Sequence, residues 1–204
     1  MHDAHNEKSR AAGLTDITGV LLAGGKSLRM GHDKARIEVA GQTLVSRSFD
    51  LLRRYFTKVL IAGDRPDLAQ PGIPAIPDIY PGSALGGLYT GLLSADTDWI
   101  FVAPCDMPYP DHRILELLLA HRNGFDAVVP RTPHGYEPVF ALYHKNCLPQ
   151  MENMLRHGQF RIYDFYQRIA IRFLDWQELP DDWERSLLNV NTPHELARLR
   201  EKQP

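Results

Sequence analysis

The sequence predicts an α/β domain with a mostly parallel sheet, and three observations lead to that fold class. Apolar runs typical of buried strands alternate along the chain with segments whose apolar residues have helical spacing. The length of 204 residues and the hydrophobic fraction of 44% are sufficient for one sizeable core. Glycines and acidic residues follow the strands, where parallel sheets collect their ligands. We therefore expect a loose tail over residues 1–15 and one domain over residues 16–204.

The expected strands are short apolar runs that end at glycine, proline or acidic residues. The first run stops at the pair Gly24-Gly25, and the strongest one stops at Pro104. A turn at Pro71-Gly72 precedes the third run. Strands are expected at residues 17–22, 58–62, 73–76, 99–103, 126–130, 138–142 and 169–174.

The expected helices are recognised by helical spacing of apolar residues and by their first residues. Thr43 is a suitable N-cap for the first helix, and Leu85 opens a glycine-rich helix. The last helix has Thr192 as N-cap, Pro193 at its first position and Glu195 to complete a capping box. Helices are expected at residues 43–56, 85–94, 111–122, 146–156, 161–168 and 193–202.

The loop after the first strand has the composition of a phosphate-binding loop. A Walker loop would need glycine at position 20, which is Val20, and the glycine spacing does not fit the Rossmann fingerprint either. A glycine pair followed by Lys26, Arg29 and Lys34 remains, and it offers close backbone approach and charge neutralisation to phosphates. The alternative is a strand-to-helix turn with solvated lysines.

Two aspartates are the other candidate ligands. Asp106 stands at the tip of the strand at residues 99–103, where carboxylates commonly hold Mg²⁺. The alternative for Asp106 is an Asx turn or a helix cap. Asp78 precedes the glycine-rich helix and can accept hydrogen bonds from a base edge or a ribose hydroxyl. Cys105 is expected to be a buried inert thiol, because no base that would activate it is evident.

Asn189 and Asn191 form a further motif near the C-terminus. Residues spaced by one lie on the same side of an extended chain, so both amides would face the same ligand. Capping explains the threonine, proline and glutamate that follow, but it does not explain the two asparagines.

The composition excludes several functional classes. The formal net charge of −2 gives no global attraction to nucleic acid or to an anionic membrane. No apolar run approaches the ~20 residues of a membrane helix, and the N-terminus lacks the apolar core of a signal peptide. Two cysteines cannot make a disulfide framework, so we expect a cytoplasmic protein in a reducing environment.

Taken together, four segments resemble the bacterial molybdenum cofactor guanylyltransferases. They are "LLAGGKSLRMGHDK", "PDIYPGSALGGLYTGL", "APCDMPYPD" and "NVNTPHEL", and the resemblance runs from about Ile17 to the C-terminus. The first segment resembles a signature of nucleotidyltransferases that act on GTP or CTP, and its adjacent glycines favour the guanylyl branch. The resemblance implies a doubly wound, Rossmann-like nucleotidyltransferase fold. It also implies transfer of GMP from GTP to molybdenum-molybdopterin with release of pyrophosphate.

The resemblance also implies a role for each matching residue. The nucleotide would be contacted by Leu22, Ala23, Gly24 and Gly25, with Asp78 as a further GTP contact. Its phosphates would be neutralised by Arg29 and Lys34, and Asp106 would hold Mg²⁺. The pterin would be faced by Asn189 and Asn191. The substrates would be GTP and molybdenum-molybdopterin, with transient contact to cofactor-delivery proteins and molybdoenzymes. We expect a monomer with no nucleic-acid or membrane partner.

Two alternatives stay open at this point. The first is a nucleotidyltransferase of the same fold that uses CTP or a sugar phosphate. The second is a non-catalytic nucleotide-binding regulator or a scaffold for cofactor delivery, which would bind GTP without releasing pyrophosphate. The joint presence of Arg29, Lys34 and Asp106 favours an enzyme over the second alternative.

Overall fold

The computed structural model describes residues 13–24 and 34–190. Their strands are β1 (Leu14–Leu22), β2 (Glu38–Val39), β3 (Gln42–Thr43), β4 (Phe56–Ala62), β5 (Ala75–Ile76), β6 (Trp99–Pro104), β7 (Ala127–Thr132), β8 (Gly135–Tyr136), β9 (Ala141–His144) and β10 (Ile171–Asp175). The first strand begins at Leu14, so Leu14 and Thr15, which were expected in the tail, belong to the strand, and Leu14 pairs with Phe56.

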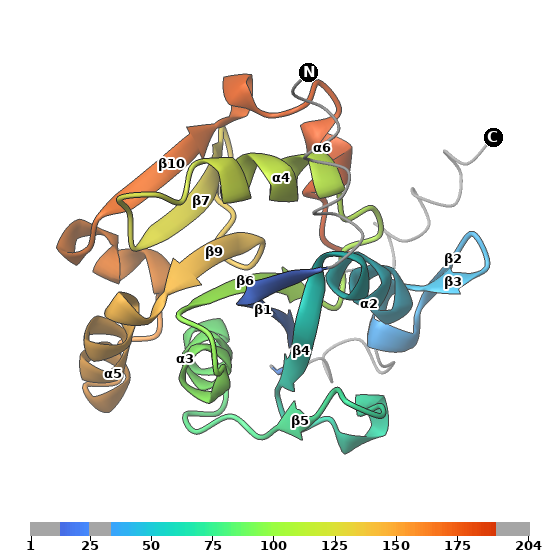
Figure 1. Ribbon diagram of the computed structural model, residues 1–204, viewed down its shortest axis with the longest axis horizontal. Helices are drawn as coiled ribbons and strands as arrows, with labels where there is room; N and C mark the ends of the chain where they lie inside the picture. Colours follow the sequence, from blue (N-terminus) through green and yellow to red (C-terminus); the bar gives the residue numbers. More distant parts are fainter. Residues whose placement is uncertain (1–12, 25–33, 191–204) are drawn as a thin grey trace.

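Eight of these strands form one mixed sheet (Figure 1). Its order is β10-β7-β9-β6-β1-β4-β5, with β8 paired to β7. The pairs β1–β4, β1–β6, β4–β5 and β7–β10 are parallel, whereas β9 runs antiparallel to β6 and β7, and β8 antiparallel to β7. The expected α/β class with a mostly parallel sheet is confirmed. The short hairpin of β2 and β3 is separate from this sheet.

The α-helices are α2 (Leu44–Tyr55), α3 (Ala84–Ser94), α4 (His112–Ala120), α5 (Leu148–Arg156) and α6 (Trp183–Ser186). The 3₁₀ helices are η2 (Lys34–Arg36), η3 (Pro66–Leu68), η4 (Lys145–Cys147), η5 (Ile162–Arg168) and η6 (Trp176–Glu178). The helix expected at residues 161–168 is therefore a 3₁₀ helix. The helix expected at residues 193–202 lies outside the described residues.

Two elements differ from the expected positions for a local reason. The strand expected at residues 138–142 occupies Ala141–His144, because the chain first turns at Pro138 and Phe140 donates its amide to the Glu137 carbonyl. The helix expected from residue 146 begins at Leu148. Pro149 lacks an amide proton and is tolerated only in the first turn of a helix, which places the start of α5 there.

Three helices that flank the site begin at capping side chains. Thr43 accepts a hydrogen bond from the Ser46 amide at the start of α2, as the sequence predicted. Ser83 caps α3, and Asp111 caps α4 by accepting from the Arg113 amide at 2.8 Å. Each cap satisfies an amide that the helix itself leaves unpaired, so the direction in which each helix leaves the sheet edge is defined locally.

The sheet is covered on both faces, and β1 shows how its side chains divide. Ile17 and Leu21 point into the core that α2, α4 and α6 cover, whereas Val20 and Leu22 point into the core beneath α3 and α5. Alternate residues of a strand face opposite sides, so a continuous apolar run is needed to fill both cores. This is the physical reason why the buried end of the first strand has apolar residues on both faces.

Candidate active site

The carboxyl edge of the sheet brings the predicted site residues together. Four register partners stand level at this edge: Leu22, Ala62, Ile76 and Pro104. Two positions beyond these partners, respectively, stand Gly24, Asp64, Asp78 and Asp106. The chain runs from β1 to β4 through α2 on one face and from β5 to β6 through α3 on the other. The order therefore reverses between β1 and β6, where open α/β sheets bind ligands.

Gly24 is in close contact with its neighbours and has no room for a side chain. A Cβ atom at Gly24 would lie 2.4 Å from Oδ2 of Asp78. Gly63, which has a φ of +137°, is equally confined, because its Cβ would lie 2.6 Å from the Gly24 amide nitrogen. The Ala23 amide donates to the Ala62 carbonyl at 2.9 Å, and this hydrogen bond holds the segment after β1 against the end of β4. Glycine at these positions is thus required by close backbone approach.

Asp78 offers an unsatisfied acceptor at this position. Its Oδ1 atom is buried and has no hydrogen-bond partner among the described residues. Burial raises the pKa of the Asp78 carboxyl above its ordinary value. A buried acceptor without a partner is costly, and a ligand N–H or O–H would satisfy it. The geometry therefore suits the nucleotide contact that the resemblance implies for Asp78.

The glycines of α3 serve packing and capping. Ser83 Oγ accepts the Gly86 amide at 3.0 Å, and the Gly87 amide donates to the Ser83 carbonyl. A Cβ at Gly86 would lie 1.8 Å from the Tyr80 carbonyl oxygen. These two amides are thus already used within the helix, and close packing accounts for Gly86.

Asp106 and Asn189 meet although they are far apart in the sequence. The Val190 amide donates to the Asp106 carbonyl at 3.0 Å. Val190 is buried with Val39 and Leu44 in a small cluster of its own, which holds the segment in place. Oδ1 of Asn189 is buried and, within residues 13–24 and 34–190, has no hydrogen-bond partner. The residue with this second unsatisfied oxygen therefore directly precedes the one that is bonded to the Asp106 carbonyl.

The predicted site residues fall into two groups. Those at the described carboxyl edge are Leu22, Ala23, Gly24, Asp78 and Asp106, with Asn189 joined to it through Val190. Gly25, Arg29 and Asn191 lie outside the described residues, and so does the side chain of Lys34, whose backbone begins η2. No cluster of three or more potential metal-ligating His, Cys, Asp or Glu side chains occurs in the part of the chain that the structure describes.

Comparison with known proteins identifies the family. Residues 19–170 match the model of the MobA-like NTP transferase domain. A protein of Pelotomaculum thermopropionicum, described as a probable molybdenum cofactor guanylyltransferase, is 33% identical over 191 residues, which cover 92% of this chain and 93% of the relative. A molybdenum cofactor guanylyltransferase of Vibrio cholerae is 33% identical over 195 residues, 93% of this chain and 94% of the relative. The chain belongs to the MobA-like NTP transferase family.

Solved structures agree with this family on the fold. The molybdopterin-guanine dinucleotide biosynthesis protein A of Archaeoglobus fulgidus superposes with a TM-score of 0.77 at 22% identity, covering 90% of this chain and 97% of that one. A 2-C-methyl-D-erythritol 4-phosphate cytidylyltransferase of Thermus thermophilus gives a TM-score of 0.63 at 15% identity, covering 89% and 96%. Like other members of the MobA-like NTP transferase family, the chain is a nucleotidyltransferase with a Rossmann-like fold. None of its described helices is long and apolar enough to span a membrane.

The structure adds residues to this family site that the sequence analysis did not select. Gly63 packs against Gly24. The local sequence does contain a signal for Gly63, because it stands directly after a strand and before Asp64. The guanidinium groups of Arg47 and Arg185 gather at the ring of Tyr109, which follows Asp106 by three residues. No local pattern marks this cluster, because its three residues come from three separate elements.

Proposed function

We propose that this nucleotidyltransferase transfers GMP from GTP to the terminal phosphate of molybdenum-molybdopterin, which yields molybdopterin guanine dinucleotide and pyrophosphate. The names of the relatives support a role in molybdopterin guanine dinucleotide synthesis. The observation that carries the proposal is the meeting of Gly24, Asp78 and Asp106 at the carboxyl edge beside the switch point. Such an edge suits a nucleotide and its acceptor.

The donor side of the proposed site consists of the residues after β1 and β5. Leu22, Ala23, Gly24 and Gly25 would present backbone groups to GTP, and Oδ1 of Asp78 would accept a hydrogen bond from the nucleoside. Arg29 and Lys34 would neutralise the triphosphate. Phosphoryl and nucleotidyl transfer depend mainly on such positioning and charge neutralisation.

The residues around Asp106 fit a divalent cation, which members of such families generally use. The available donors are a carboxylate and an amide oxygen, and Oδ1 of Asn189 is buried without a partner among the described residues. Oxygen donors of this kind suit Mg²⁺. We therefore propose that Asp106 holds Mg²⁺ and that Asn189 and Asn191 face the pterin beside it. When bound, the ion would withdraw negative charge from the phosphates of the substrate.

The acceptor in this proposal needs no general base. A phosphate monoester has a second pKa of about 6, so its terminal oxygen is already anionic at neutral pH. That oxygen forms the new bond to the α-phosphorus of GTP, the bond from the α-phosphorus to the bridging oxygen breaks, and pyrophosphate leaves. The protein's task is to bring two anions together, which explains the requirement for Arg29 and Lys34.

The decisive experiment measures pyrophosphate release from GTP with molybdenum-loaded molybdopterin. We expect Asp106→Ala to lose transfer while its thermal unfolding stays cooperative, and Lys34→Ala to require more GTP and to turn over more slowly. The control is Asp164→Ala, an exposed aspartate in η5 far along the chain. Normal turnover by a folded Asp106→Ala protein would remove Asp106 from the site.

Binding measurements separate the remaining alternatives. A ligand that binds only the native state raises apparent stability, so thermal shifts with GTP, CTP, ATP and UTP rank the nucleotides. A larger shift with CTP would favour a cytidylyltransferase. A GTP shift without pyrophosphate release would indicate a non-catalytic binding protein. The proposal also includes a cytoplasmic monomer that meets delivery proteins or molybdoenzymes transiently, and gel filtration tests the monomer.

A further inference from the structure

A cavity lies on the face of the sheet opposite α3, away from the proposed nucleoside contact. It has a volume of about 580 Å³ and is lined by residues of α2, α4 and α6 and by the loop over residues 108–111. These helices cover one core of the sheet, whereas α3 covers the other. A volume of this size is typical of small-molecule sites. Asp78 is not among its lining residues, so the cavity is separate from the proposed nucleoside contact.

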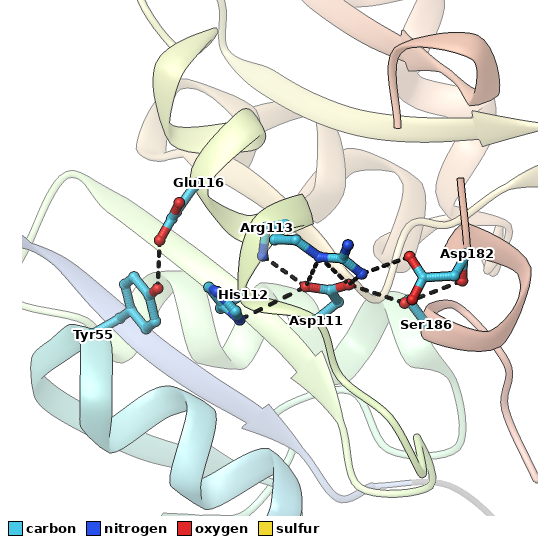
Figure 2. Close-up of polar contacts among 7 residues, drawn as sticks. All are labelled: Tyr55, Asp111, His112, Arg113, Glu116, Asp182 and Ser186. Atoms are coloured by element: carbon cyan, nitrogen blue, oxygen red, sulfur yellow. Dashed lines mark hydrogen bonds and ion pairs between the residues drawn. The ribbon is translucent and has the colours of Figure 1, made fainter. Parts of the chain in front are cut away.

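The carboxylates of this cavity are already bound by neighbouring side chains. Asp111 accepts hydrogen bonds from Arg113 and from Ser186 Oγ, and Arg113 also reaches Asp182, as Figure 2 shows. Burial by itself would raise the pKa of Asp111, but the hydrogen bonds from Arg113 and Ser186 hold it below its ordinary value. Asp50 accepts from the Gln42 amide group at 2.6 Å. The three acids, Asp50, Asp111 and Asp182, therefore each have a hydrogen-bond partner within the cavity wall.

Three arginines of the cavity remain without such compensation. Within the described residues, Arg47, Arg54 and Arg185 form no ion pair. The Arg185 guanidinium lies 4.1 Å from the centre of the Tyr109 ring, and that of Arg47 lies 5.7 Å from it. Arg47 donates to the Val39 carbonyl, yet its Nε is buried without a hydrogen-bond acceptor. A buried cationic donor without an acceptor is costly, and an anion would satisfy both its N–H and its charge.

We propose that this cavity binds the phosphate group of a small molecule. Guanidinium groups match phosphate oxygens in pairs of hydrogen bonds, and two of them stand over one ring. Arg54 follows Arg47 by two helical turns on α2 and extends the basic wall on the same helix face. Four arginines stand against three aspartates in the lining, so the ligand meets a wall with a formal net charge of +1.

The cavity adjoins the transfer site, and this connection rests on the proposed function. Tyr109 packs against the cluster of Val39, Leu44 and Val190, and the Val190 amide is bonded to the Asp106 carbonyl. Arg185, near the end of α6, also lies only four residues before Asn189 in the sequence. The phosphate therefore has two possible sources: the phosphorylated acceptor of the transfer, or free phosphate and pyrophosphate.

The test of the site uses inorganic pyrophosphate as the probe and needs neither GTP nor the pterin. The Nε–Hε signals of Arg47, Arg54 and Arg185 are followed by NMR during titration, in a protein that carries Asp106→Ala. We expect saturable shifts of all three signals. In Arg185→Gln, the remaining signals should require at least tenfold more pyrophosphate. Arg168→Gln, which removes an exposed charge elsewhere, is the matched control.

The outcomes test separately whether the cavity binds phosphate and which molecule supplies that phosphate. The absence of saturable shifts, or equal affinity in Arg185→Gln and Arg168→Gln, overturns the site even if transfer activity is intact. Arg185 is exposed, so its replacement keeps the test valid if Arg47→Gln fails to fold. A higher KM for the acceptor with an unchanged KM for GTP in Arg185→Gln assigns the phosphate to the acceptor. Weaker pyrophosphate binding with both KM values unchanged assigns it to free phosphate.

Discussion

At the scale of single residues, Gly24 shows most directly how the sequence determines the site. The space that a methyl group would need is occupied by the carboxylate of Asp78, at 2.4 Å from the Cβ position. Any side chain there would displace either the loop or Asp78. The glycine therefore lets one aspartate lie against the backbone that is proposed to carry the nucleotide.

This contact predicts a binding defect for Gly24→Ala. We expect the affinity for GTP, measured by calorimetry, to fall at least tenfold, because Asp78 must move. Gly91→Ala is the comparison, since its Cβ would lie 2.7 Å from a Val20 methyl group inside the core. That variant should unfold at a lower temperature but keep its GTP affinity. Equal GTP affinity in Gly24→Ala and the wild type would contradict the assignment of this edge.

Glu137, which follows β8, predicts a pH dependence of stability. Burial raises the pKa of its carboxyl to about 7, from the ordinary 4.5. A raised pKa in the folded state means that the protonated form stabilises the fold. That contribution is complete below about pH 4.5 and is lost as the pH rises through about 7.

Denaturant unfolding at pH 5, 6, 7 and 8 measures this effect. We expect the free energy of unfolding of the wild type to fall across this range relative to that of Glu137→Gln, which cannot ionise at this position. Glu184→Gln, at an exposed glutamate, is the control. Parallel pH profiles for the wild type and Glu137→Gln would contradict the prediction.

Single residues also show what the sequence could and could not predict about the site. Gly24, Asp78 and Asp106 lie at the carboxyl edge, as expected, because each follows the end of a strand and strand ends are visible in local sequence. The pair Arg47 and Arg185 was not found, because nothing in either segment indicates that one tyrosine ring lies near both. Contacts between distant elements depend on packing, which local patterns do not encode.

At the scale of elements, helix α2 is the clearest success of the sequence analysis. It was expected at residues 43–56 and spans Leu44–Tyr55, with Thr43 as its cap. The weaker cases were the two-residue strands of the hairpin and η5. Strands that short have no readable period, and a 3₁₀ helix shares much of its apolar spacing with an α-helix. Propensity thus predicted long elements and missed short ones.

The cap of α2 can be tested directly. We expect Thr43→Ala to destabilise the protein by about 1 kcal/mol, because the Ser46 amide loses its acceptor. A loss of that size lowers the unfolding temperature by roughly 2–4 °C in a domain of this length. Thr43→Ser retains the hydroxyl and should remain close to the wild type. Scanning calorimetry distinguishes the two, and equal losses in both would show that the hydroxyl is not the cause.

At the scale of the whole molecule, one contact joins the end of the described region to the carboxyl edge of the sheet. The Val190 amide is bonded to Asp106, and its side chain is buried with Val39 and Leu44. Local sequence marks Asn189 but does not place it, because the position of Val190 beside it depends on this long-range packing. The sheet order and the strand ends predicted the site's location, and tertiary contacts complete it.

Val190→Ala should therefore impair both stability and transfer. Removal of two buried methyl groups costs roughly 1–3 kcal/mol. The same change at Val59, buried in β4, should have a similar effect on stability but leave kcat unchanged. We expect kcat to fall only in Val190→Ala, measured by pyrophosphate release at saturating substrates. A normal kcat in Val190→Ala would indicate that the anchoring of Asn189 beside Asp106 does not matter for the reaction.

The bond between Val190 and Asp106 also has a consequence for the order in which the enzyme matures. On the ribosome, β1, β4, β5 and β6 emerge early, together with Gly24, Asp78 and Asp106, which follow three of these strands. The segment that completes the opposite side of Asp106 emerges only after α6. Because chains are synthesised from the N-terminus, a nascent chain can complete its proposed nucleotide pocket before it can catalyse transfer. In the proposed function, catalytic competence would thus arrive only with the segment that follows α6.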